Sequence, residues 1–141
     1  SIESNIDAYY SQGINLSNAT THSLISHQSN NLYTAFGDGT NATEAVASNT
    51  LPTTQSIYGI YYDGGNTIDA YVNGTQQSLT YITQDASSSS GTEYKMSIGR
   101  PGEFDGNYFE GDISEIILYS EDKGDTASEI IEKINNHYEV Y

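Results

Sequence analysis

The sequence predicts an all-β domain, an antiparallel two-sheet β-sandwich that ends in one α-helix. Three observations predict this fold class. Short segments rich in Tyr, Thr, Ile and Val recur along the chain, as suits pleated and half-buried strands. Clusters of Gly, Asn and Asp separate them about every ten residues. A single amphipathic helix pattern lies at the C-terminus. The 141 residues have the length of one domain, so we expect a single jelly roll over residues 1–141.

The first part of the chain predicts one clear hairpin. Two alternating segments, residues 22–28 and 32–37, flank the polar turn at residues 29–31. Residues 1–21 predict a short or irregular strand, and residues 44–47 predict a polar loop or an edge strand. One face of the hairpin is expected to carry Leu32, Thr34 and Phe36.

The middle of the chain predicts a three-stranded meander. Residues 55–62 are apolar on both faces, which is typical of a central strand between two layers. The Asp-Gly-Gly-Asn turn at residues 63–66 leads to a strand at residues 67–72. A second, Asn-Gly turn then leads to a strand at residues 75–82.

The C-terminal part predicts two further strands and the helix. The strands are expected at residues 93–99 and 108–119, the second of them buried on both sides near its end. Thr126 and Glu129 match a capping box at the start of the helix. The apolar stripe of the helix is expected to dock against a sheet edge, and it consists of Ile130, Ile134, Tyr138 and Tyr141.

Charge and composition exclude several classes of function. Four basic residues stand against 19 acidic ones, which gives a formal net charge of −15. Such a surface repels nucleic-acid phosphates and anionic lipid headgroups, so we expect no nucleic-acid partner. No segment approaches the roughly 20 apolar residues of a membrane-spanning helix, and we expect no membrane insertion. The absence of cysteine excludes disulfides, thiolate metal sites and thiol nucleophiles.

Four motifs in a fixed order carry a family resemblance. They are YDG at residues 62–64, YVNG at residues 71–74, IGR at residues 98–100 and FEGDISEIILY at residues 109–119. The chain resembles the laminin G-like, concanavalin A-like jelly-roll superfamily over residues 24–141. Relative to that family, the N-terminal strands are short or incomplete, so either the domain is a minimal version or a neighbouring copy supplies the missing edge by strand addition.

The resemblance implies a non-catalytic, lectin-like module for adhesion or glycan recognition at an extracellular, cell or virion surface. Its partner would be a glycan or a surface receptor. Sugars bind to flat aromatic faces beside planar polar groups, which Tyr and Asp or Asn side chains supply. The candidate ligand-binding residues are Tyr62, Asp69, Tyr71, Asn107 and Tyr108. For each tyrosine, an ordinary place in the core or on the sheet is the competing interpretation.

Acidic turns make calcium the candidate cofactor. Ca²⁺ needs several carboxylate and carbonyl oxygens that converge from loops. Acidic turns offer such oxygens at Asp38, at Asp63 with Asn66, and at Glu103 and Asp105 with Asn107. Pentraxins and laminin-type modules, which the chain resembles, use such loops for calcium, and residues 100–108 lie in the comparable position. The competing interpretation is that Asp, Asn and Gly occur there because turns require them.

Two other functions stay open. A structural subunit of a virion, tail fibre or surface filament would self-associate through the sandwich edges. A small glycoside hydrolase would need a pair of carboxylates about 5 Å apart. The segment from Glu103 to Asp105 opens the E-x-D-x-x-E pattern of the family's glucanases, but Tyr108 stands where the last acid belongs. We therefore expect no enzyme.

Overall fold

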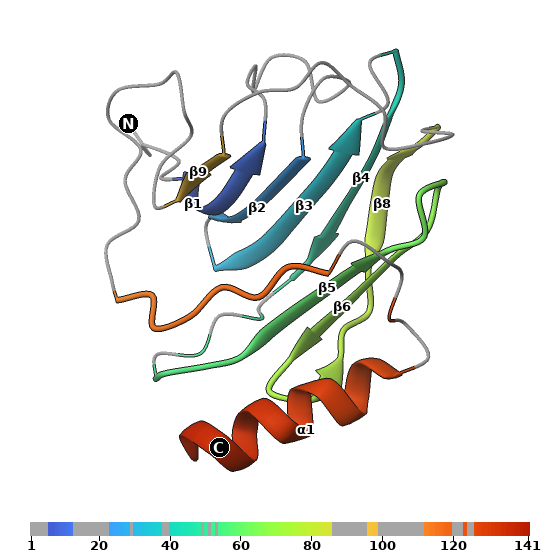
Figure 1. The fold of residues 1–141 in the computed structure, drawn as a ribbon. Helices are drawn as coiled ribbons and strands as arrows, with labels where there is room; N and C mark the ends of the chain where they lie inside the picture. The colour runs from blue at the N-terminus through green and yellow to red at the C-terminus, as the bar shows by residue number, and fades with distance from the viewer. Residues whose placement is uncertain are drawn as a thin grey trace.

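The computed structural model shows a mostly β chain with two antiparallel sheets and one C-terminal helix (Figure 1). It describes residues 6–12, 23–28, 30–37, 40–48, 50, 52, 54–85, 96–98, 112–119, 123 and 126–141. The predicted β class and the terminal helix are confirmed. Within these ranges, no helix is long and apolar enough to span a membrane.

The larger sheet has six strands in the order β8-β4-β3-β2-β1-β9. Their bounds are β1 Ile6–Gln12, β2 Ser23–Gln28, β3 Asn31–Gly37, β4 Ala42–Ala47, β8 Thr80–Gln84 and β9 Met96–Ile98. The predicted hairpin is confirmed as β2 and β3, with Asn30 in the left-handed region at the turn (φ 67°).

The smaller sheet has the order β5-β6-β7. Its strands are β5 Tyr58–Tyr62, β6 Ile68–Val72 and β7 Thr75–Gln76. Both predicted turns are confirmed. Gly64 adopts φ 81° after β5, and Asn73 and Gly74 adopt φ 49° and 73°, the left-handed pair that a tight type I′ hairpin requires.

The two sheets and the helix form three layers (Figure 1). Leu32 and Ala47 of the larger sheet pack against Ala70 and Val72 of the smaller one, and all four are buried. Phe36 of β3 stacks on Tyr62 of β5, with ring centroids 4.3 Å apart. The alternation expected along β3 is therefore confirmed, and the arrangement is compatible with the predicted sandwich.

Strand β8 joins the two sheets at one side of this core. It pairs with β4 in the larger sheet, and its Tyr81 reaches β6 in the smaller one. The Tyr81 hydroxyl accepts a hydrogen bond from the Ile68 N–H at 2.9 Å and donates one to the Ile68 carbonyl at 3.0 Å. Gln84 donates to the Asn66 carbonyl at 2.9 Å. The Tyr81 hydroxyl thus satisfies β6 backbone groups where β7 has ended, and Gln84 satisfies a carbonyl in the turn before β6.

Three expectations about the strands need correction. Residues 44–47 were expected in a loop or at an edge, but β4 lies between β3 and β8. Residues 75–82 were expected to form one strand, but they divide into β7 and β8 in different sheets. Residues 55–62 were expected to form a central strand, but β5 lies at the end of its sheet. It is apolar on both faces because one face meets the larger sheet and the other meets the helix.

The strand expected at residues 108–119 also differs. Residues 112–119 form no strand ladder with the described residues, and the earlier part of the expected strand lies outside those residues. The expected burial at its end is wrong, because Ile117, Leu118 and Tyr119 are exposed. In Figure 1 this segment runs between the larger sheet and the helix.

Helix α1 (Ala127–Tyr138) packs on the outer face of the smaller sheet, whereas a sheet edge was expected. The face that docks is also different, since Ala127 and Ile131 are its buried residues. The expected capping box is absent, because the Thr126 hydroxyl donates to the Lys123 carbonyl at 3.1 Å and makes no side-chain cap bond.

A substitution at Thr34 tests how much stability a buried hydroxyl group costs. Thr34 Oγ1 has no hydrogen-bond partner among the described residues, although the residue is fully buried. Replacing an unsatisfied polar group by a methyl group removes its desolvation penalty, so Thr34→Val should raise the free energy of unfolding by about 1 kcal/mol. Urea denaturation followed by circular dichroism measures this change.

The matched control is Thr43→Val on the neighbouring strand. Thr43 is equally buried, but its hydroxyl donates to the Gly65 carbonyl at 3.4 Å. The control should therefore bring no gain in stability. A Thr34→Val variant less stable than the original chain would contradict the prediction.

Candidate functional site

The predicted ligand-binding residue Tyr62 lies between the two sheets. Its ring stacks on Phe36 at an interplanar angle of 5°, and its hydroxyl donates to the Gly65 carbonyl at 2.6 Å. One ring face and the hydroxyl are thus already used within the fold. Tyr62 contributes to inter-sheet packing and to the turn after β5.

Asp69 and Tyr71 lie on the outer face of β6, as alternation predicts. Asp69 accepts a hydrogen bond from the Gln76 amide at 3.0 Å. Tyr71 packs edge-on against Tyr61, with centroids 5.5 Å apart and an interplanar angle of 84°. Burial, together with the neighbouring phenols of Tyr71 and Tyr119, raises the pKa of Tyr61. Tyr61 and Tyr71 therefore form an aromatic pair, and the hydroxyl of Tyr61 reaches α1.

The predicted calcium ligands Asp63 and Asn66 form a hairpin turn. Asp63 Oδ1 accepts hydrogen bonds from the N–H groups of Gly65 at 2.8 Å and Thr67 at 3.1 Å. Slight burial raises the pKa of the Asp63 carboxyl, but these hydrogen bonds outweigh it and hold the pKa below its ordinary value. Asn66 Oδ1 accepts from the Thr67 hydroxyl at 3.4 Å. The turn itself explains both side chains.

The other predicted site residues, Glu103, Asp105, Asn107 and Tyr108, lie outside the described residues. Among the described residues, no group of three or more His, Asp or Glu side chains could hold a metal ion. The calcium site stays a prediction: the Oδ1 atoms of Asp63 and Asn66 accept hydrogen bonds within the turn, and the other two predicted ligands lie outside the described residues.

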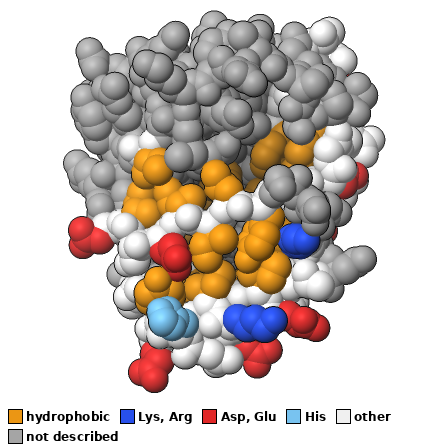
Figure 2. All heavy atoms as spheres, in the orientation of Figure 1, with side chains coloured by type: hydrophobic (Ala, Val, Ile, Leu, Met, Phe, Trp, Pro, Cys, Tyr) orange, Lys and Arg blue, Asp and Glu red, His pale blue; other side chains and the backbone are white. Residues whose placement is uncertain are grey.

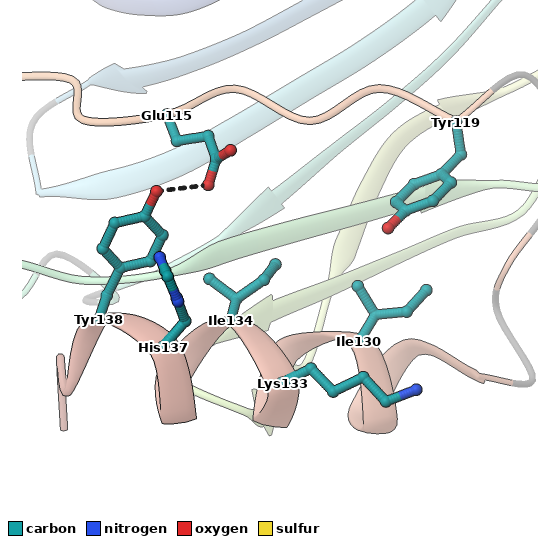
Figure 3. A pocket seen from close by; sticks show the side chains of 7 residues that line it. All are labelled: Glu115, Tyr119, Ile130, Lys133, Ile134, His137 and Tyr138. Carbon is teal, nitrogen blue, oxygen red and sulfur yellow. Dashed lines mark hydrogen bonds between the residues drawn. The ribbon is translucent and has the colours of Figure 1, made fainter.

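A groove that the sequence did not indicate lies between α1 and residues 112–119. Its volume is about 300 Å³. It is lined by Glu115, Tyr119, Ile130, Lys133, Ile134, His137 and Tyr138 (Figure 3). Figure 2 shows hydrophobic side chains gathered on this face, with acidic side chains around them. The groove has the size and the mixed apolar and polar lining of a small ligand site.

One end of the groove is polar. The Tyr138 hydroxyl donates to Glu115 Oε2 at 2.8 Å, and this bond raises the pKa of Tyr138. The His137 ring packs edge-on against Tyr138, with centroids 4.6 Å apart. The bond ties the helix to residues 112–119 and holds one carboxylate oxygen in place. Glu115 Oε1 has no hydrogen-bond partner among the described residues.

The middle and the other end of the groove are apolar. Figure 3 shows Ile134 and Ile130 between Tyr138 and Tyr119, with the two aromatic rings at opposite ends. Tyr119 is 52% exposed and Tyr138 is 39% exposed. Flat aromatic faces that remain accessible beside a carboxylate can stack on sugar rings and accept hydrogen bonds from their hydroxyls.

The position of α1 depends on a glycine in β5. A Cβ atom at Gly59 would lie 2.9 Å from Ile131 Cδ1 and 3.2 Å from the Tyr61 ring. Ile131, which is 1% exposed, therefore occupies the space that the side chain of any larger residue at position 59 would need. The Tyr61 hydroxyl also donates to the Ala127 carbonyl at 3.4 Å. These contacts hold the groove wall against the sheet.

The C-terminal end of α1 is held by Asn135. Its Oδ1 accepts hydrogen bonds from the N–H groups of Val140 and Tyr141, each at 3.0 Å, and its Nδ2 donates to the Tyr141 carbonyl at 2.9 Å. Glu139 adopts φ 52°, the left-handed conformation that often ends a helix. Residues after the helix thereby fold back, and the Tyr141 hydroxyl lies over Gly74.

Sequence reasoning placed three groove residues elsewhere. Ile130, Ile134 and Tyr138 were assigned to the docking stripe, but they line the groove, and Ile131 docks. The sequence also contains a second apolar pair at helical spacing, because Ala127 and Ile131 are four residues apart. This pair could have indicated the face that docks. Comparison of the chain with protein-family models, with curated proteins and with solved structures found no match.

Gly59→Ala tests the contact that positions the helix. The added methyl would overlap Ile131, so the free energy of unfolding should fall by about 1 to 2 kcal/mol. Alanine would otherwise cost little at a strand position, so a loss of this size reports the contact. Urea denaturation of the purified variant measures it.

Two variants serve as controls. Gly59→Ala combined with Ile131→Val removes the Cδ1 atom and should recover part of the loss, which a double-mutant cycle quantifies. Gly65→Ala adds a methyl whose nearest neighbour is an Asp63 oxygen at 3.4 Å, and it should change stability less. A Gly59→Ala chain as stable as the original would show that the contact does not constrain α1.

Proposed function

We propose that the chain is a non-catalytic glycan-recognition module that acts at an extracellular, cell or particle surface. The groove between α1 and residues 112–119 carries the proposal. It presents two exposed tyrosine rings, an apolar floor and one carboxylate, of which one oxygen has no hydrogen-bond partner in the part of the chain that the structure describes. Apolar surface for the sugar face and acceptors for the hydroxyls are the two requirements of sugar binding.

We propose the jelly-roll form of the sandwich and membership of the laminin G-like superfamily for the fold. What supports this is the stacking of two antiparallel sheets, the closing helix and the order of the four motifs in the sequence. The same fold class hosts lectins and hydrolases alike, so the function is argued from the groove.

A non-catalytic role is supported by the chemistry of the groove. Among the described residues that line it, Glu115 is the one carboxylate. Retaining and inverting glycosidases use two carboxylates across the scissile bond. Glu115 is therefore proposed as a hydrogen-bond acceptor for the ligand. Calcium stays a proposal for the turn with Asp63 and Asn66 and for the acidic segment that contains Glu103 and Asp105.

Tyr119→Ala tests glycan recognition. Loss of the exposed ring removes a stacking surface, so affinity should fall about tenfold, or ~1.4 kcal/mol, for the glycans that bind the original chain. A glycan array that includes neutral, acidic and amino sugars identifies those glycans, and titration calorimetry measures the affinity. Repeating the array with a chelator tests the proposed calcium.

The matched control is Leu118→Ala, because Leu118 is 60% exposed and is absent from the groove lining. It should leave binding unchanged. If no glycan on the array binds the original chain, with or without calcium, the proposed function is wrong.

A structural subunit that self-associates is the second candidate, and one observation favours it. Strand β8 lies at the end of the larger sheet, and its Ile82 is 55% exposed. An exposed apolar edge strand is a surface on which another strand can pair. The partner would be a second copy of this chain in a virion, fibre or filament.

Ile82→Lys tests the second candidate. If the β8 edge mediates assembly, the original chain should form oligomers at high concentration. The lysine variant should stay monomeric, because assembly would bury an unpaired charge at the contact. Light scattering over a concentration series measures the mass. An original chain that stays monomeric at every concentration would exclude assembly through this edge.

A further inference from the structure

The two aromatic ends of the groove set a minimum length for its ligand. Figure 3 shows Tyr119 and Tyr138 at opposite ends, separated by Ile130 and Ile134. A single sugar ring can stack on one tyrosine at a time. A ligand that uses both rings must therefore extend along the groove, as an oligosaccharide does.

The charge of the groove walls favours a cationic ligand. The two walls, residues 112–119 and α1 with its C-terminal residues, carry five carboxylates and one lysine. The exposed carboxylates belong to Asp112, Glu115, Glu129, Glu132 and Glu139. The whole chain has a formal net charge of −15, which includes these groups. A field of this sign attracts cations and repels anionic sugars.

The groove lining itself carries one carboxylate, Glu115, and one amine, Lys133, so the excess of negative charge comes from the carboxylates around the groove. In Figure 3 the Lys133 side chain runs along the helix and its amine lies far from Glu115. At the polar end, Tyr138 holds Glu115 Oε2, while Oε1 has no partner among the described residues. A carboxylate held in this way can accept a charge-assisted hydrogen bond from an ammonium group.

We propose that the groove binds an oligosaccharide of amino sugars whose amines are free and protonated. One ammonium group binds Glu115, and sugar rings stack on Tyr119 and Tyr138. Tyr138 also acts as a positioning residue for Glu115. The inference rests on the proposed glycan-recognition function and specifies the ligand of the same site.

The experiment compares two series of matched ligands by titration calorimetry. One series contains glucosamine oligomers of increasing length, and the other contains the N-acetylated oligomers of the same lengths. The pH is one at which the free amines are protonated. The free-amine oligomers long enough to span the groove should bind at least about tenfold more tightly than their acetylated counterparts and than the monosaccharide. Added salt should reduce this preference by screening.

Glu115→Gln is the variant that tests the proposed contact. It keeps the size of the side chain and removes its charge, so it should lose about tenfold in affinity for the free-amine oligomers and little for the acetylated ones. The matched control is Glu132→Gln, which removes a charge from α1 outside the groove lining. It should change affinity less than about twofold.

Different outcomes separate this inference from the proposed function. Equal binding of acetylated and free-amine oligomers would overturn the charge assignment and leave glycan recognition intact. No binding of either series, together with an array without any bound glycan, would overturn both. A Glu115→Gln variant that binds like the original chain would place the ligand elsewhere. A tetralysine peptide that binds as tightly as the sugar would show that only charge is recognised.

Discussion

The contact between Ile131 and Gly59 decides where α1 lies, and the groove depends on it. Because Gly59 has no side chain, Ile131 packs closely against β5, and an added Cβ would lie 2.9 Å from its Cδ1. With Ala127 and Ile131 facing the sheet, the helical repeat directs Ile130, Ile134 and Tyr138 toward residues 112–119. One close approach at the sheet thereby determines which helix residues form a wall of the groove.

The smaller sheet, which lies beneath the helix, is held by its packing on the larger sheet and by a contact along β6. Small residues such as Ala47 and Ala70 allow the two sheets to pack closely, and the Phe36–Tyr62 stack fills the space near one end of β5. At β6, the Tyr81 hydroxyl of β8 forms hydrogen bonds with both the N–H and the carbonyl of Ile68. A side chain thus takes the place of a neighbouring strand, which leaves these backbone groups satisfied at the edge of β6. The groove is built on this rigid part of the fold.

The groove combines exposed aromatic rings with an excess of negative charge around it. Apolar side chains exposed at a surface gain no free energy from burial, and where they gather they mark interaction sites; Tyr119 and Tyr138 are both accessible. The hydrogen bond from Tyr138 to Glu115 links the two walls and restrains the carboxylate. The proposed recognition, by stacking and by hydrogen bonds to one oriented carboxylate, uses these same few residues.

The sequence by itself determined the features that arise from local chemistry. The Asn73-Gly74 turn requires positive φ at both positions, the hairpin of β2 and β3 follows from alternation, and the terminal helix follows from its apolar spacing. The outward direction of Asp69 and Tyr71 also follows from the two-residue repeat of a strand. These features depend on residues close together in the chain.

Only the tertiary structure decided which apolar surfaces are covered. The C-terminal helix has two apolar stripes, and both satisfy the helical repeat. The stripe with Ile131 docks because it meets Gly59, a residue more than 70 positions earlier in the chain. Residues 112–119 have the pattern of a buried strand, yet Tyr119 is exposed beside the groove. Burial depends on contacts between distant segments, and a local pattern shows which residues can be buried but not which of them find a partner.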